Sequence, residues 1–166
     1  GRTLRQRYSG VADWDYITEV VDAVETPVIA NGDVVDAKTA KACLSQTHAA
    51  GLMVGRGAIG RPAVFGEIKV GLGWMEREEL PWIAAHDGNW DDLGYVAQQF
   101  ATRRWCWNRY IELARETTGL NLKSMRGHAV SFTKGLPSAK KIRNIMHGKQ
   151  SREEFAQATS EFLASN

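Results

Sequence analysis

Apolar residues in the first third of the chain alternate between helical spacing and short unbroken runs. A helix is predicted over 14–25 after Asp13, a suitable N-cap, and a second over 36–46, capped by the aspartate at its start. The apolar positions of the first helix recur at helical intervals, at Ile17, Val20, Val21 and Val24. The runs 28–30 and 52–54 do not alternate and are followed closely by glycine. They therefore predict strands buried on both faces of a parallel sheet, within repeating β and α units.

The remainder of the chain has a purely helical period. Glycines, a proline and paired aspartates between 71 and 92 predict a linker or an elaborated loop. A long helix is predicted from Leu93 to a point before Gly119. Further helices are predicted over 122–134, 139–147 and 152–163. The last of these starts with a capping box at Ser151 and Glu154, so an α/β part is expected before the linker and an all-α part after it.

The 166 residues have the composition of a folded globular protein, with 43% hydrophobic and 24% charged residues. This composition excludes disordered and collagen-like chains. The sequence contains no long apolar stretch that would serve as a signal peptide or membrane anchor, which favours a cytoplasmic protein. Cys43 and Cys106 lie far apart in periodic apolar segments, so we expect buried, reduced thiols rather than a disulfide or a metal site.

The net charge of +2 hides an uneven distribution of charge along the chain. Residues 1–102 carry 9 Lys and Arg against 14 Asp and Glu, whereas residues 103–149 carry 11 against 2. The second block therefore has a charge of +9, which is typical of a protein that binds a polyanion such as nucleic acid. Solvated helix faces are the alternative interpretation of the same charges.

Two junctions of similar design follow the predicted strands, at residues 28–33 and 52–57. Each has glycine just beyond the strand, and in a (β/α)₈ barrel this edge is the catalytic face, where late loops commonly bind phosphate. Glycine allows backbone N–H groups to approach an anion, Arg56 offers a guanidinium, and a short helix start is expected at 58–61. Taken singly, Asn31-Gly32 also suits a turn, and the second junction also suits a tight loop with a solvated arginine.

These junctions lie within a longer set of motifs that resembles the tRNA-dihydrouridine synthases in order and spacing. The barrel motifs are Gly1-Arg2-Thr3, Tyr8, Gly10, Ala12-Asp13-Trp14, Pro27-Val28-Ile29-Ala30-Asn31-Gly32-Asp33 and Val54-Gly55-Arg56-Gly57-Ala58-Ile59-Gly60. The helical motifs are Met125-Arg126-Gly127-His128 and Lys134-Gly135-Leu136-Pro137. The resemblance spans nearly the whole chain, and residues 67–92 are its least typical part.

The resemblance implies the C-terminal part of an FMN-binding TIM barrel over 1–70, a linker over 71–92 and a helical tRNA-binding domain over 93–166. It further implies reduction of a flipped-out uridine in tRNA to dihydrouridine, with NADPH as the reductant of the flavin. By position in the motifs, Asn31, Gly32 and Asp33 would contact FMN, and Gly55 and Arg56 would hold its phosphate.

Several parts of the family pattern are expected upstream of Gly1, among them the loop that carries the proton-donating cysteine. Neither Cys43 nor Cys106 matches that motif, so no catalytic residue is assigned and the chain alone is expected to lack synthase activity. The family often has a basic residue where Leu4 stands here, although Arg5 follows it. A partial barrel leaves open sheet edges, which predicts self-association.

Within the resemblance, the basic residues of the helical part predict contacts with RNA phosphates. The expected RNA-binding residues are Arg5, Arg103, Arg104, Arg126, Lys134, Lys140, Lys141 and Arg143. Trp107 falls on the apolar stripe of its helix, so it and Tyr110 are expected to pack, and Trp105 is the better candidate for stacking on a base. His128 suits either an RNA contact or a helix end, and His86 is expected to have a surface role.

Two other functions remain compatible with the sequence. One is a different FMN-binding or phosphate-binding barrel that acts as an oxidoreductase on a small molecule, against which the +9 block argues. The other is a non-catalytic RNA-binding module in which the partial barrel is a scaffold. Flavin binding separates the two enzyme hypotheses from the binding module.

Overall fold

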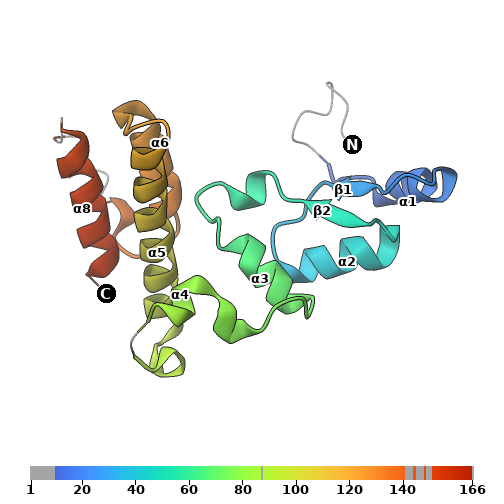
Figure 1. The fold of residues 1–166 in the computed structure, drawn as a ribbon, viewed down its shortest axis with the longest axis horizontal. Coiled ribbons are helices and arrows are strands. Elements are labelled where there is room, and N and C mark those ends of the chain that lie inside the picture. Colours follow the sequence, from blue (N-terminus) through green and yellow to red (C-terminus); the bar gives the residue numbers. More distant parts are fainter. Residues whose placement is uncertain (1–9, 87, 141–143, 145–147, 149–150, 166) are drawn as a thin grey trace. The chain divides into compact units, whose positions relative to one another are not determined.

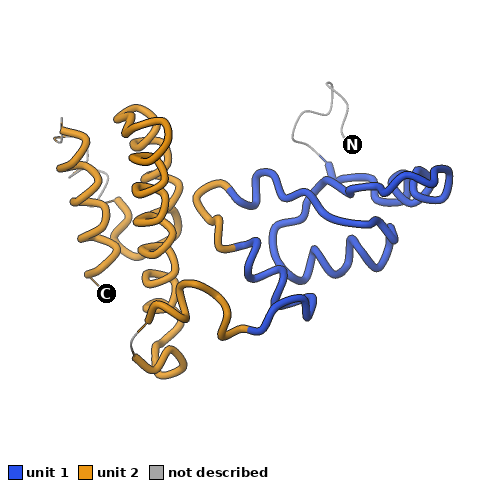
Figure 2. Tube along the Cα trace, in the orientation of Figure 1, with its two compact units in different colours: residues 1–58, 64–76 blue, residues 59–63, 77–166 orange. Residues whose placement is uncertain are grey.

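A computed structural model describes residues 10–86, 88–140, 144, 148 and 151–165. The chain forms two compact units, coloured separately in Figure 2. Unit 1 comprises residues 1–58 and 64–76, and unit 2 comprises residues 59–63 and 77–166. The fold is α/β, because unit 1 combines helices with a small parallel sheet, and the described part of unit 2 is helical.

Unit 1 is built around a βαβ segment. Its elements are α1 (Trp14–Ala23), β1 (Ile29–Asn31), α2 (Ala37–Thr47), β2 (Gly51–Met53) and α3 (Val64–Gly71) (Figure 1). The two strands are parallel neighbours, and Ala30 is paired with Leu52 in their register. The predicted parallel pairing with a helical crossover is confirmed, which places the C-terminal ends of both strands at the same edge.

Two helices of unit 1, α1 and α2, begin where side chains satisfy free backbone N–H groups. The Asp13 carboxylate accepts a hydrogen bond from Tyr16 N at 3.0 Å, as its N-cap position predicts. Asp36 accepts from Thr39 N at 2.8 Å, while the Thr39 hydroxyl donates to the Asp36 carboxylate and receives the Asp36 N–H, which forms a capping box. Local signals in the sequence therefore fix both helix starts.

The core of unit 1 lies on one face of the strand pair. Buried side chains from β1, α2 and α3 form it, namely Ala30, Ala40, Cys43, Val64 and Ile68, and α1 adds partly buried residues such as Ile17. The opposite face is open, with Ile29 57% exposed and Met53 48% exposed. The prediction that both faces are buried is therefore wrong, because no element of the described residues covers the face of Ile29 and Met53.

Unit 2 is dominated by long helices. Its elements are a 3₁₀ turn at Arg77–Glu79, α4 (Pro81–Ala84), a 3₁₀ turn at Trp90–Asp92, α5 (Tyr95–Glu116), α6 (Leu122–Thr133) and α8 (Arg152–Ala164). The segment predicted as a linker or elaborated loop thus contains short helical turns. The helix predicted over 139–147 falls mostly outside the described residues. Ser151 caps α8 by accepting a hydrogen bond from Glu154 N at 3.5 Å.

The core of unit 2 forms where α5 packs against α6 and α8 (Figure 1). Trp107 is fully buried there, and its indole N–H donates to the carbonyl oxygen of Ala156 at 3.2 Å. Its ring lies 5.4 Å from Tyr110 and 5.6 Å from Phe132. The predicted packing role of Trp107 and Tyr110 is confirmed. Across the described part of the chain, no helix is both long and apolar enough to cross a membrane.

Candidate functional site

The loops after β1 and β2 meet at one edge of unit 1. Parallel pairing sets Asn31 of β1 opposite Met53 of β2, so the residues that follow each strand leave the sheet side by side. An ion pair joins the two loops, with Arg56 Nη2 lying 3.5 Å from Asp33 Oδ1. The two junctions singled out in the sequence therefore form one site.

The loop after β1 is held in place by hydrogen bonds that it accepts from Ala12 and Trp14. The backbone N–H of Ala12 donates to Asp33 Oδ2 at 2.6 Å, and the indole N–H of Trp14 donates to the carbonyl oxygen of Gly32 at 3.0 Å. Asp33 has a φ of 55°, a left-handed conformation that aspartate tolerates better than most residues. Asp33 is thus both a loop anchor and the partner of Arg56.

At this edge the fold requires glycine at Gly32, whereas packing does not explain the glycine at Gly55. Gly32 has a φ of 139°, and a Cβ there would lie 2.4 Å from Ala12 Cβ, so a side chain would be strained and would clash. A Cβ at Gly55 would have Met53 Sδ as its nearest neighbour, at 3.8 Å, which is an ordinary contact. Gly55 therefore leaves its backbone accessible without being needed for the fold.

The donor set at this edge fits a phosphate group. The Arg56 side chain is 55% exposed, and the guanidinium of arginine suits bidentate pairing with phosphate oxygens. Beside it, a Cβ at Gly55 would meet only side-chain atoms of Met53 within 4 Å, so the backbone of Gly55 is open to the close approach of an anion. Asp33 counterbalances the positive charge of Arg56, but the contact between Arg56 Nη2 and Asp33 Oδ1 is long, at 3.5 Å. A bound anion can therefore compete with Asp33 for Arg56. The arrangement supports anion binding and by itself performs no reaction.

The five residues predicted to contact FMN all lie at this edge: Asn31, Gly32, Asp33, Gly55 and Arg56. Asn31 is exposed at the end of β1. The short helix start predicted at 58–61 is wrong. A single 3₁₀ turn spans Arg56–Ala58 instead, and α3 begins only at Val64, after Pro62 and the positive φ of Gly60 interrupt the helical path.

Both cysteines are buried, Cys43 in unit 1 and Cys106 in unit 2. Cys43 is fully buried in the core of unit 1, and burial raises the pKa of its thiol, an effect that the nearby Thr47 hydroxyl partly offsets. Cys106 is 6% exposed on α5. The prediction of buried, free thiols is confirmed. Within the ranges that the structure describes, no three His, Cys, Asp or Glu side chains gather as metal ligands do.

The sequence of the chain matches a known protein family over its whole length. The family model described as "Dihydrouridine synthase (Dus)" matches residues 1–166, the whole of the chain. The chain is a member of the dihydrouridine synthase family.

Curated proteins resemble the chain over 49% to 89% of its length. A Rickettsia conorii protein named "Probable tRNA-dihydrouridine synthase" is 34% identical over 147 residues, which cover 89% of this chain and 40% of that protein. A Mycobacterium leprae protein of the same name is 32% identical over 87% of this chain and 34% of its own length. A Rhodobacter capsulatus protein, also so named, is 48% identical over 49% of this chain and 25% of its own length. The chain therefore spans about two fifths of the length of the Rickettsia relative.

The basic residues predicted to bind RNA divide into three groups in the structure. Arg104, Arg126, Lys134 and Lys140 are exposed in unit 2. Arg103 is half-buried instead, and its Nη1 donates to the carbonyl oxygens of Phe132 at 2.9 Å and Lys134 at 2.6 Å, at the end of α6. The predicted residues that lie outside the described part of the chain are Arg5, Lys141 and Arg143.

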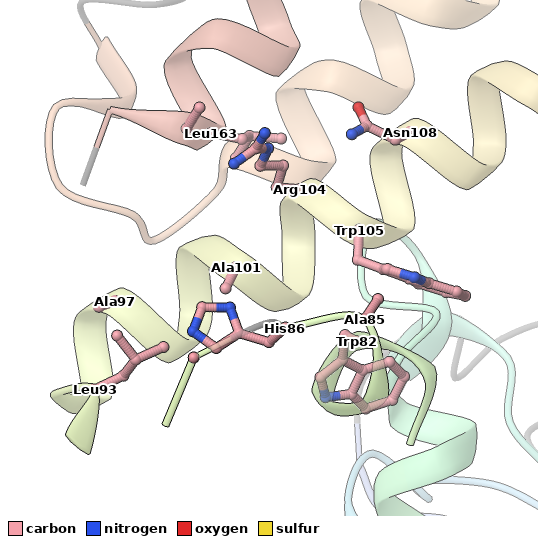
Figure 3. Close-up of a pocket in the computed structure, with 12 residues that line it drawn as sticks. Trp82, Ala85, His86, Leu93, Ala97, Ala101, Arg104, Trp105, Asn108 and Leu163 are labelled. Atoms are coloured by element: carbon pink, nitrogen blue, oxygen red, sulfur yellow. The ribbon is translucent and has the colours of Figure 1, made fainter. Parts of the chain in front are cut away.

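Unit 2 of the family member also contains a pocket that the sequence did not reveal. It is lined by α4, the segment after it, α5 and the end of α8, with Trp82, His86, Arg104 and Trp105 among the lining residues (Figure 3). The sequence singles out only Trp105 and Arg104, as a stacking candidate and a phosphate contact. Trp82 and His86 belong to the segment predicted as a linker, where no periodic pattern marks a wall. His128 lies elsewhere, with its ring 5.0 Å from that of Tyr110.

Proposed function

We propose that the protein encoded by the reading frame that includes this chain is a cytoplasmic tRNA-dihydrouridine synthase. It reduces uridine in tRNA to 5,6-dihydrouridine with FMN as cofactor and NADPH as reductant. Residues 1–70 then form the C-terminal part of a TIM barrel, 71–92 a linker and 93–166 a helical tRNA-binding domain. The observation that carries the proposal is the family match over the whole chain, combined with two glycine-bearing loops joined at one edge of a parallel strand pair.

In this proposal the edge after β1 and β2 holds the FMN phosphate. Arg56 pairs with phosphate oxygens, and the backbone beside Gly55 approaches the same group in the space that a side chain would fill. Asn31, Gly32 and Asp33 contact the cofactor from the neighbouring loop, where Asp33 keeps Arg56 oriented. FMN, when bound, supplies the hydride that reduces the uracil ring.

The proton donor is proposed to lie outside these 166 residues. A general acid must reach the reacting base, whereas Cys43 is fully buried and Cys106 is 6% exposed. The target uridine must also leave its stack before either face of the ring is accessible, so the base is flipped towards the edge after β1 and β2. The chain alone is therefore proposed to be inactive as a synthase.

Unit 2 is proposed to bind the tRNA through its basic side chains. Arg104, Arg126, Lys134 and Lys140 are exposed within a block whose net charge is +9, and Arg5, Lys141 and Arg143 are proposed to add to it. Contacts of this kind bind the phosphate backbone regardless of sequence, and selectivity then comes from RNA shape. Arg103 contributes indirectly, because its guanidinium contacts the end of α6.

Flavin binding by matched variants tests the proposed phosphate site. In the protein encoded by the natural reading frame, Arg56→Gln should weaken FMN binding about tenfold or more, since a charged hydrogen bond to phosphate is lost. Lys41→Gln removes the same charge from an exposed position of α2 and should leave FMN binding unchanged. Binding is measured by the quenching of FMN fluorescence on titration.

Either of two results would overturn the site. Equal loss of FMN affinity in the two variants would show a general effect of charge rather than a contact from Arg56. A wild-type protein that binds tRNA but no FMN would instead support the non-catalytic RNA-binding module.

A further inference from the structure

A pocket in unit 2 has the size of a small-ligand site. Its volume is about 580 Å³, within the range of roughly 300–1,000 Å³ that is usual for such sites. Its walls come from α4, the segment between α4 and α5, α5 itself and the end of α8, and all of its described lining residues belong to unit 2. The side chains that carry its chemistry are Trp82, His86, Arg104, Trp105 and Asn108 (Figure 3).

Two aromatic rings of the pocket, those of Trp105 and His86, each pack against a buried tryptophan. Trp105 is half-buried, and its ring packs edge-on against the buried Trp82 at 6.1 Å between centroids. His86 packs in the same manner against the buried Trp90 at 5.5 Å. A partly exposed ring held by a buried neighbour is a rigid platform on which a planar base can stack at little entropic cost.

Polar groups in the pocket are donors without partners in the described protein. Arg104 is exposed and makes no hydrogen bond or ion pair with any described residue. Asn108 Oδ1 accepts from Ser160 Oγ at 2.8 Å, which leaves the amide N–H groups of Asn108 available to a ligand. None of the described lining residues carries a carboxylate. The pocket therefore suits a ligand that combines a flat ring, acceptor atoms and a negative charge.

We propose that this pocket binds one unstacked nucleotide of an RNA. The base stacks on Trp105, its acceptor atoms receive hydrogen bonds from Asn108, and the adjoining phosphate pairs with Arg104. An acidic peptide would satisfy Arg104 alone, whereas a nucleotide uses the ring, the amide and the guanidinium together. Three of the lining residues, Arg104, Trp105 and Asn108, belong to the block of charge +9, and such a block attracts a polyanion.

This inference rests on the proposed function for the identity of the RNA, which would be tRNA, and it adds a contact that selects an unpaired nucleotide. The Trp82 and His86 side of the pocket comes from residues 67–92, the part of the chain that is least typical of the family pattern. The pocket is thus proposed to help decide which tRNA region the protein recognises.

Crosslinking locates the nucleotide directly. The full chain is irradiated with a single-stranded oligouridine of about ten nucleotides that carries 4-thiouridine, and the crosslinked peptide is identified by mass spectrometry. Trypsin cleaves after Arg104 and Arg109, so the expected peptide is Trp105 to Arg109. Trp107 in that peptide is fully buried, which assigns a crosslinked tryptophan to Trp105.

Affinity measurements on matched variants supply the second test. Trp105→Phe keeps a stacking ring and should bind the oligonucleotide like the wild type, whereas Trp105→Leu should bind about 5- to 100-fold more weakly. Arg104→Gln should weaken binding and lower the salt dependence by about one phosphate contact. Arg152→Gln removes an equal charge from the exposed start of α8. It should reduce the affinity and the salt dependence less than Arg104→Gln does. Circular dichroism checks that each variant is folded. If a Trp105 variant unfolds, Arg104→Gln still tests the pocket, because the side chain of Arg104 is exposed.

Three outcomes would overturn the pocket assignment. Wild-type binding by folded Trp105→Leu and Arg104→Gln would place the RNA elsewhere and leave the proposed function intact. Tight binding of free uridine monophosphate in place of the oligonucleotide would make this a mononucleotide site. Absence of any binding of tRNA or oligonucleotide by the wild-type chain would contradict the proposed RNA-binding domain as well.

Discussion

Gly32 and Asp33 leave β1 with positive φ angles of 139° and 55°. This backbone path brings the Asp33 carboxylate to Ala12 N and to Arg56. The conformation is maintained by those contacts, because positive φ costs free energy for any residue other than glycine. The geometry of the proposed phosphate site thus depends on a few atoms of one loop.

Two glycine substitutions should separate fold from function at this edge. Gly32→Ala should lower the free energy of unfolding by about 1–3 kcal/mol, since a side chain would be strained and would clash with Ala12. Gly55→Ala meets only Met53 at 3.8 Å, so it should leave stability unchanged and weaken FMN binding. Urea denaturation and FMN titration measure the two effects. Equal destabilisation by both variants would contradict this division.

The thiols should be inert in the folded chain. Burial raises the pKa of Cys43, so at any pH near neutrality a smaller fraction is thiolate than for a free cysteine, and thiolate is the reactive form. Cys106 is buried as well. At pH 8, a chromogenic disulfide reagent should react slowly with the native chain and with two thiols in denaturant. Rapid reaction of the native chain would show that Cys43 or Cys106 is accessible.

At the scale of secondary structure, α5 holds the end of α6 through one arginine. The Arg103 guanidinium donates to two carbonyl oxygens at the C-terminus of α6, where backbone acceptors lack partners within the helix. The positive charge of Arg103 also interacts favourably with the negative end of the α6 dipole. Arg103, which was predicted from the sequence to bind RNA, therefore holds the end of α6.

Replacement of Arg103 should lower the stability of the folded chain. Arg103→Met should lower the free energy of unfolding by about 1–3 kcal/mol, because carbonyl groups lose a charged donor. Arg109 lies on the same helix but forms only an exposed pair with Glu112 at 3.0 Å, so Arg109→Met should cost about 0.5 kcal/mol or less. Thermal and urea unfolding of the two variants provide the comparison. An effect of Arg103→Met no larger than that of the control would contradict the assignment.

Element starts and types were accessible from the sequence where they depend on local signals. Asp13 and Asp36 cap helices as predicted, and the long helices of unit 2 follow their apolar stripes because a helix buries one face. The pocket was not accessible, because its walls join a segment without periodicity to Leu163 at the end of the chain. Only the folded arrangement brings Trp82 and Arg104 to one cavity.

The predicted burial of the strands failed for a reason that concerns the whole molecule. A short apolar run reports that a strand is suited to burial, but covering both faces requires other elements. In the described residues, the face of Ile29 and Met53 has no cover. In the fold that we propose, this open face points into the barrel, where inward side chains of the remaining strands would cover it.

This open face should promote association of the isolated chain. Exposed apolar side chains beside unpaired strand edges favour contacts between copies. Ile29→Thr with Met53→Gln should shift the chain towards monomer in light scattering, whereas Val130→Thr, an exposed apolar position of α6, should not. A wild-type chain that is already a well-behaved monomer would contradict the expectation.

The central claim concerns what the two units do together in the natural protein, namely the reduction of uridine in tRNA. The most direct test expresses the protein encoded by the natural reading frame in a bacterium deprived of its own dihydrouridine synthases, and quantifies dihydrouridine in tRNA by mass spectrometry. The account predicts that dihydrouridine reappears with the wild-type protein and falls about tenfold or more with Arg56→Gln. A folded protein that restores no dihydrouridine at any tRNA position would contradict it.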